Sequence, residues 1–415
     1  MSGILREARF LLRDRGALLW IALALLLSAA ATAFGIAEVR EQRTTIATLL
    51  GEDARDRADA LAGQSDWGGA AYAAFHLTYA PPSDLAFAAL GQRDIAPWLH
   101  RVRMLALEGQ IHEADTKNAD FGLIGRFDFA FLAAAVAPLL LILMLHDLRA
   151  GEQAAGRHDL LVATAGDGAR LWLPRAGVRL AALSLALLLP FWAGSVIEGA
   201  DGLTVLAASG LVLAALFAWW LIIEAAARSQ GSPAVLLAAL VGIWLALALL
   251  VPAGAKAAIE ASHPLPDGAE ILMLQREAVN DAWDLPKEAT MGPFLARHPH
   301  WRSHARIDRP FEWKWYYAFQ QVGDQRAQPI VEAYREGRLA RDEAAGLAAF
   351  LSPASLVERG FERLARTDTR AMIAYEDSVR DFHAQLRAFY YPFLFRDPPY
   401  DPIAFERLPR YELTP

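Results

Sequence analysis

The sequence predicts an all-α membrane protein with about five transmembrane helices, a large helical extracytoplasmic loop and a helical extracytoplasmic C-terminal domain. Of its 415 residues, 55% are hydrophobic, and they gather into leucine-, alanine- and valine-rich blocks with the charged residues between them. Five blocks reach the roughly 20 apolar residues that a helix needs to cross a bilayer. Arginine is concentrated in alternate links between these blocks, as in membrane proteins of fixed orientation.

Each block is expected to be a helix, because lipid offers no hydrogen-bond partner to an open backbone. The predicted spans are residues 17–36, 127–145, 180–197, 203–223 and 233–251. The first follows four arginines, as a signal peptide would, but its apolar run exceeds the 7–15 residues of a secretory segment, and we expect it to be retained. Pro138 and Pro190 lie inside spans two and three and are expected to kink them.

The arginines also orient the chain, since short cytoplasmic links are rich in Lys and Arg. The N-terminal tail carries four arginines, the link between spans two and three carries five, the link GADG carries none, and Arg228 lies between spans four and five. These links place the N-terminus in the cytoplasm and the C-terminal domain outside a bacterial inner (plasma) membrane. The predicted divisions are 1–36 (tail and first span), 37–126 (extracytoplasmic helical loop), 127–251 (spans two to five, with cytoplasmic coupling segment 147–179) and 252–415 (extracytoplasmic C-terminal domain).

The interiors of the spans are nearly free of charge, which argues against an ion-coupled carrier. Glu224, at the inner end of the fourth span, is expected to pair with Arg228 one helical turn later.

Helical spacing predicts further helices outside the spans. Val39, Ile46 and Leu61 indicate that the first helix continues outward, residues 81–98 are broken by Pro and Gly, and residues 100–118 are expected to form a returning helix. In the tail, apolar residues over 371–395 and over 341–364 predict helices, the second interrupted at Ser352-Pro353, and the last residues predict an extended arm packed on the domain. The aromatic run at 311–319 could be an interfacial belt or a hydrophobic core, and its soluble flanks favour the core.

Several kinds of chemistry are excluded. The chain has no cysteine, which rules out disulfides and thiolate catalysis, and no P-loop, zinc-protease, nucleophile-elbow or dinucleotide-binding motif. A net charge of −7 gives no basic field for nucleic acid. We therefore expect no enzyme activity, no catalytic residue and no cofactor in this chain; a membrane-embedded peptidase is disfavoured because the spans hold no polar constellation.

One histidine cluster could bind copper or zinc: His298, His300 and His304. Pro299 breaks the helix that would align them, and no carboxylate close in sequence orients the imidazoles, so no metal site is assigned.

The link after the second span is more informative. It places Glu152 and Gly156 before the short apolar stretch that contains Leu160 and Leu161, and Arg170 follows a Gly-Asp-Gly turn. A piece of one to two turns between two spans suits the docking of a soluble partner, and it equally suits a helix resting at the lipid head groups.

At this link the sequence resembles the permease subunits of type-2 ABC exporters. In that family a Glu-containing segment, a Gly four residues on, a Leu pair and a downstream Arg form the coupling helix that contacts the ATPase, and Glu152, Gly156, Leu160, Leu161 and Arg170 take those places here. Ala165 stands where the family often has Pro, so the helix is expected to end differently.

A second resemblance covers most of the chain, to an uncharacterised branch labelled as permeases for multicopper-enzyme maturation. The segments that carry it are PPSDLAFAALGQRDIAPW, FDFAF, HDLRAGEQ, ARHPHW, FEWKWYYAFQQVGDQ, FLSPASL and DFHAQLRAFYYPFLF. The resemblance implies an ATP-driven exporter or membrane-remodelling system, with ATP bound by a separate ATPase chain and with a second permease chain, alike or related, as partner. The copper label is an inherited name. The family usually has six spans, whereas five are predicted here.

The alternative hypothesis is a non-transporting membrane scaffold or sensor whose outer domain binds envelope proteins. A stable outer partner without ATP-dependent flux would favour it.

Overall fold

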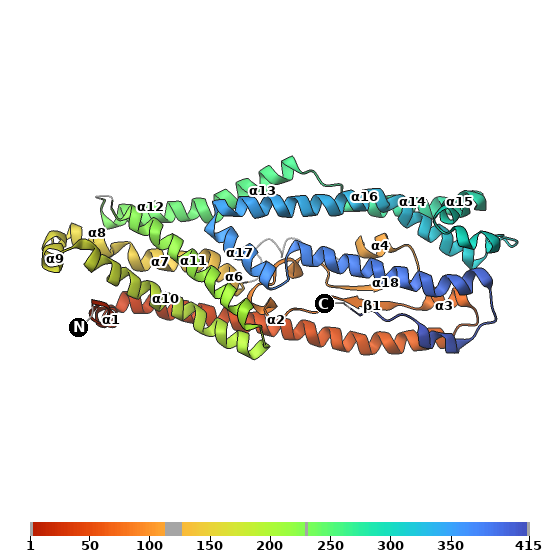
Figure 1. Cartoon of the computed structure of the whole chain (residues 1–415), viewed down its shortest axis with the longest axis horizontal. Helices are drawn as coiled ribbons and strands as arrows, with labels where there is room; N and C mark the ends of the chain where they lie inside the picture. Colours follow the sequence, from red (N-terminus) through yellow and green to blue (C-terminus); the bar gives the residue numbers. More distant parts are fainter. Residues whose placement is uncertain (1–2, 113–126, 229–230, 413–415) are drawn as a thin grey trace.

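The computed structural model of the chain is an elongated helical molecule, in which a bundle of long apolar helices continues into a second helical body (Figure 1). The structure describes residues 3–112, 127–228 and 231–412. We call the second body, residues 63–79, 95–112, 263–348 and 366–412, the distal domain. The helix α2 (Arg15–Ala62) runs the length of the molecule along one edge and belongs to both parts.

Each predicted span lies in a helix that is long and apolar enough to cross a membrane, which confirms that prediction. These helices are Arg15–Ala62, Phe129–Ala154, Gly168–Glu198, Gly202–Ala226 and Pro233–Ser262. Each begins after a side chain that accepts a hydrogen bond from a backbone N–H of the first turn, and these capping residues are Asp14, Asp128, Asp167, Asp201 and Ser232. Such caps satisfy donors that the helix itself leaves free.

Two of the bundle helices contain a π-helical turn that ends two residues before a proline. The segment α6 (Phe129–Phe131) passes through η3 (Leu132–Val136) into α7 (Ala137–Leu145), which carries Pro138. Likewise α12 (Pro233–Leu245) passes through η4 (Ala246–Leu250) into α13 (Val251–Ser262), which carries Pro252. A proline lacks the N–H of a regular helix and crowds the preceding turn, and a wide turn relieves both effects.

The first helix is 48 residues long and continues past the predicted span to Ala62, as its apolar spacing predicts. The Pro/Gly-broken stretch after it forms two short 3-10 helices, η1 (Ala86–Ala88) and η2 (Gly91–Asp94), which return into the bundle. Phe87 is fully buried there, beside Phe191 of α10 (Gly168–Glu198). Gly35 and Gly194 make room for it: a Cβ at Gly35 would collide with the Phe87 backbone, and one at Gly194 would collide with Thr32 and lie 3.0 Å from the Phe87 ring.

The predicted returning helix over 100–118 is wrong in its first half. Residues Leu99–Val102 form the strand β2, paired antiparallel with β1 (His76–Tyr79), so that His76 lies opposite Val102. Only α4 (Leu107–His112) is helical, and residues 113–118 lie outside the described part of the chain. Val102, one of the apolar residues that suggested a helix, is buried in a strand whose partner lies 26 positions earlier in the chain, and a local pattern does not reveal such pairing.

The distal domain packs helices around an aromatic core. Its elements are α3 (Trp67–Ala73), α14 (Gly268–Asp284), α15 (Lys287–Arg297), η5 (Pro299–His304), α16 (Trp313–Ala348), α18 (Thr369–Arg396) and η7 (Pro402–Arg407). Trp315, Tyr317 and Phe319 are buried in this core, which confirms the core interpretation of the aromatic run. The C-terminal arm lies against the same core through side chains such as Phe405.

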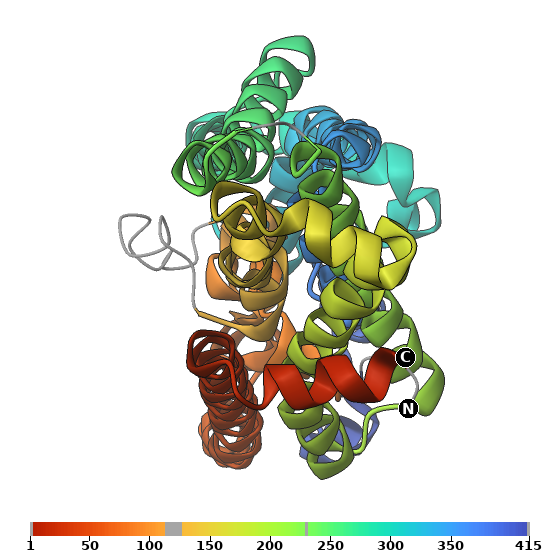
Figure 2. The same cartoon turned by 90° about the vertical axis from the view of Figure 1, so that its left-hand side faces the viewer.

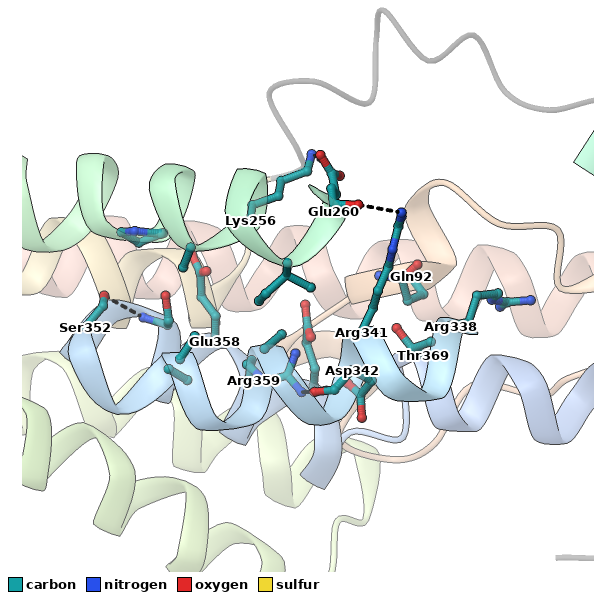
Figure 3. A pocket seen from close by; sticks show the side chains of 18 of the residues that line it. Gln92, Lys256, Glu260, Arg338, Arg341, Asp342, Ser352, Glu358, Arg359 and Thr369 are labelled. Carbon is teal, nitrogen blue, oxygen red and sulfur yellow. Dashed lines mark hydrogen bonds and ion pairs between the residues drawn. The ribbon is translucent and has the colours of Figure 1, made fainter. Parts of the chain in front are cut away.

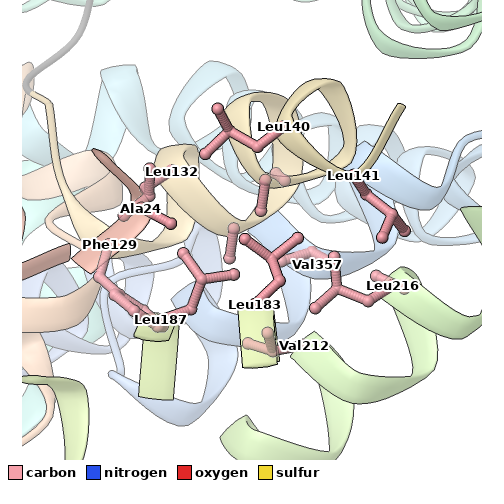
Figure 4. Close-up of a cluster of buried hydrophobic side chains, with 14 of the residues drawn as sticks. Ala24, Phe129, Leu132, Leu140, Leu141, Leu183, Leu187, Val212, Leu216 and Val357 are labelled. Carbon is pink, nitrogen blue, oxygen red and sulfur yellow. The ribbon is translucent and has the colours of Figure 1, made fainter. Parts of the chain in front are cut away.

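The short helix α17 (Pro353–Leu364) belongs to the bundle although its neighbours in sequence belong to the distal domain. After η6 (Ala349–Leu351) the chain turns at Ser352, as the sequence predicts, and α17 packs between the spans. The ring of Phe361 lies 5.6 Å from that of Phe129 and 6.0 Å from that of Phe191. Figure 4 shows Val357 of α17 among leucines of three spans. The distal domain is thereby anchored in the bundle core.

Candidate functional site

The predicted coupling segment forms a helical connection between two spans, at the end of the molecule farthest from the distal domain (Figure 1). It consists of α8 (Asp147–Ala154), α9 (His158–Ala165) and the start of α10. Gly156 and Gly166 lie at the two ends of α9 with φ of 68° and 76°, values that side chains disfavour. The Asp167 carboxylate accepts a hydrogen bond from Ala169 N at 3.1 Å and starts α10.

The two-turn helix α9 has an attached face and an exposed face. On the attached face, the His158 ring stacks on that of Trp172 in α10, with centroids 5.7 Å apart. On the other face, Leu160 is 68% exposed, and no residue of α9 is buried. An exposed leucine on a helix held by its neighbours is suited to contact with a partner or with the membrane surface.

The structure places all five predicted coupling residues at this end, on consecutive elements. Glu152, in the last turn of α8, accepts a hydrogen bond from Arg157 Nε at 2.8 Å, across the turn that contains Gly156. Leu161 is half-buried beside the exposed Leu160, and Arg170 is exposed on the first turn of α10. The helix ends at Ala165 and the positive-φ Gly166, so glycine provides the stop without the proline that the family often has.

Sequence reasoning missed a helix at the same end. The N-terminal tail forms α1 (Gly3–Leu11), which lies across the end of the bundle (Figure 2). Its fully buried Glu7 pairs with Arg175 of α10 at 3.1 Å. Ile4, Ala8 and Leu11 recur at helical spacing and could have indicated this helix.

A second ion pair fixes the junction between α1 and α2. The Asp14 carboxylate accepts a hydrogen bond from Arg179 Nη2 at 2.9 Å and one from Ala17 N at 3.1 Å. Burial opposes ionisation of this carboxyl, but the hydrogen bonds outweigh it and lower the pKa of Asp14 below its ordinary value. The N-terminal helix is thus tied to the same span, α10, that carries α9.

Glu224 does not make the predicted pair with Arg228. In α11 (Gly202–Ala226) it lies 3.8 Å from Arg149 of α8. The prediction used only neighbours on one helix, whereas the fold brings the second span's exit beside the fourth span's end. This contact attaches the coupling segment to a further bundle helix.

The three histidines of the candidate metal cluster lie in the distal domain, but their side chains contact different residues. His298 Nε2 is hydrogen-bonded to Gln321 Nε2 at 2.6 Å, and its ring lies against Phe294. His300 and His304 each lie against Trp301. In the described ranges, no group of three His, Asp or Glu side chains is placed to hold a metal ion.

Comparison with known proteins identifies one similarity. A family model described as "Domain of unknown function (DUF3526)" matches residues 269–414, less than half of the chain. No curated protein and no solved structure matches the chain. The matched segment begins in α14 and includes α17 and the arm; the turn that carries α9 lies outside it.

Proposed function

We propose that this chain is the permease subunit of an ATP-driven ABC export or membrane-remodelling system, energised by a separate ATPase chain that docks on α9. The observation that supports it most is the exposed face of α9 with Leu160 at its centre, held at the end of five apolar helices between two glycine turns. Such a small projecting helix offers a soluble protein a contact that is joined directly to the spans.

The connections of α9 give a mechanical route for this energy. A push on α9 reaches the second span through α8, the third span through α10, and the fourth span through the contact between Arg149 and Glu224. Helices transmit such displacements as rigid elements, because packed interiors have low compressibility. The bundle in turn holds α17, so movement of the spans would move the distal domain.

The proposal includes an orientation and a set of partners. The end with α1 and α9 faces the cytoplasm of a bacterial inner membrane, and the distal domain is extracytoplasmic, in keeping with the arginine distribution. The fifth apolar helix, Pro233–Ser262, has the smallest buried share among the five, 11%. That exposed surface suits contact with lipids and with a second permease chain.

A pull-down from membranes with paired variants tests the proposal. Leu160→Asp places a charge on the exposed face of α9, and Ile403→Asp places the same charge on an equally exposed residue of η7, at 69% exposure. The wild type and Ile403→Asp should recover an ATP-binding protein, and Leu160→Asp should lose at least about tenfold of it, as for a charge buried in an interface. Equal recovery with both variants would contradict docking on α9. Recovery of envelope proteins alone would favour the scaffold or sensor hypothesis.

A further inference from the structure

A cleft of about 620 Å³ lies where the distal domain meets the bundle, between α13, α16 and α17 (Figure 3). One part of its lining is apolar, with Val251, Pro252, Ala255 and Ile259 from α13 and Ala345, Ala348 and Ala349 from α16 and η6. The other part is polar and charged. A cleft of this size and mixed lining is typical of a small-molecule site.

The basic side chains of the cleft already have partners. Lys256 lies 3.9 Å from Glu260, Arg338 bonds Glu376 at 2.7 Å, Arg341 donates to His263 O at 2.7 Å, and Arg359 bonds Asp342 at 2.6 Å. Asp342 also accepts a hydrogen bond from Arg370 at 3.0 Å. These groups leave little positive charge to attract an anion.

Two carboxyl groups in the cleft differ from these pairs. Glu358 and Glu362 lie one turn apart on α17 and line the cleft, and within the described ranges neither side chain has a hydrogen bond or an ion pair. Burial and then the charge of nearby Asp128 raise the pKa of Glu358 to about 7. For Glu362, burial and then repulsion by Glu358, Asp368 and Asp128 outweigh the opposing charge of Arg359 and raise the pKa to about 7. The charged groups that surround them are Asp128, Lys256, Glu260, Arg338, Arg341, Asp342, Arg359 and Asp368. The unmet charge of the cleft is therefore negative.

Exposed apolar side chains stand next in sequence to residues that line the cleft. On η4, which leads into α13, Leu250 is 69% exposed, and at the turn into α17, Leu347 and Phe350 are each 75% exposed. Leu250 belongs to the fifth membrane-length helix and directly precedes Val251, which lines the cleft. A ligand whose head group lies in the cleft could keep its chain on this surface or in lipid.

We propose that this cleft binds the ammonium head group of a cationic amphiphile between Glu358 and Glu362, with the apolar chain along α13 and η6. A positive head group supplies the charge that both carboxylates lack, and the apolar wall accepts the first methylenes of the chain. A neutral or anionic head group would leave two buried carboxylates without a counter-charge. The binding site goes beyond the proposed permease function, and it requires neither an ATPase nor nucleotide.

Binding of a fixed cation should be coupled to proton release. A cation favours the ionised carboxylates and therefore lowers their pKa, so the free protein must lose a proton that it holds below about pH 7. Linkage of one proton with this pKa makes binding about tenfold tighter at about pH 8 than at about pH 6.

The experiment uses the full chain in neutral detergent and dodecyltrimethylammonium, whose charge does not titrate, as the probe. Calorimetric titration in two buffers of different ionisation enthalpy, corrected for partition into empty micelles, measures affinity and released protons. The isosteric double variant Glu358→Gln with Glu362→Gln should lose at least about tenfold in affinity and all proton release. Glu343→Gln, at an exposed carboxylate of α16 outside the cleft lining, should behave as the wild type.

Three results would overturn the proposal: a wild-type affinity independent of pH, unchanged binding by the double variant, or equal binding of a zwitterionic sulfobetaine with the same chain. A single cooperative unfolding transition of the double variant, as in Glu343→Gln, verifies that it is folded. Since no nucleotide or ATPase is present, failure here is distinguishable from failure of docking on α9.

Discussion

Replacing Gly35 with alanine should weaken the packing of the first span against η1. A Cβ at this position would lie 1.9 Å from the carbonyl oxygen of Phe87 and 2.8 Å from its carbonyl carbon. The obstacle is backbone, so rotation of a side chain cannot relieve the overlap, and η1 or α2 must move. Phe87 is fully buried against Phe191, which leaves η1 no space to retreat without disturbing the bundle core.

The size of the effect follows from two opposing contributions. Overpacking of a close-packed interior costs about 1–3 kcal/mol. Alanine is preferred to glycine within a helix by roughly 0.5–1 kcal/mol, which offsets part of that cost. A net loss of about 1–2 kcal/mol should lower the unfolding midpoint by roughly 1–2 °C in a chain of this length.

Thermal unfolding of the detergent-solubilised protein, followed by tryptophan fluorescence, measures this shift. The matched control is Gly177→Ala in α10, where a Cβ would meet no atom within 4 Å, and its midpoint should stay equal or rise. A midpoint for Gly35→Ala at or above that of Gly177→Ala would refute the proposed close contact with η1.

Three further predictions concern charge and orientation. Glu198→Gln should lower stability by about 1–3 kcal/mol, because this buried carboxylate bonds two arginines of α2 at 2.7 and 3.1 Å where the bundle meets the distal domain. As the pH rises from about 5 to about 8, the unfolding midpoint of the wild type should fall relative to that of the Glu358→Gln/Glu362→Gln variant. The reason is that the pKa values in the folded protein, about 7, exceed the ordinary 4.5, so the stability that the protonated carboxyl groups contribute is lost across that pH window. In the cysteine-free chain, a membrane-impermeant maleimide should label Ile403→Cys in intact spheroplasts and Thr164→Cys only after permeabilisation.

Each of these has a result that contradicts it. An unfolding midpoint of Glu198→Gln equal to that of the wild type would show that the ion pairs of Glu198 contribute nothing to stability. The exposed variant Asp84→Asn is the control. Parallel midpoints at all pH values would exclude raised pKa values in the cleft. Labelling of the α9 cysteine in intact spheroplasts would reverse the orientation.

The parts of the fold that the sequence predicts are those determined by local pattern. The five apolar helices, the outward extension of α2 and the helix break at Ser352 each depend on residues close in sequence. Asp and Ser caps and proline positions act within one turn, so their effect is visible without the fold.

The parts that escaped prediction depend on contacts between distant residues. Strand β2 depends on its pairing with β1, in which His76 lies opposite Val102. Helix α17 packs in the bundle through Phe361, whose ring lies beside those of Phe129 and Phe191. The partner of Glu224 is likewise on another helix. The residues of the candidate coupling site were predicted from one contiguous segment, whereas the cleft combines three helices and had no signal in sequence.

Photo-crosslinking at position 160 determines whether an ATPase docks on α9. A benzoylphenylalanine in place of Leu160, in native membranes, should form a covalent adduct with an ATP-binding protein, because that side chain is 68% exposed on the outer face of α9. The same group at Ile403 should form none. Adducts of position 160 with lipid alone, or with an envelope protein, would contradict docking of an ATPase at this end of the bundle.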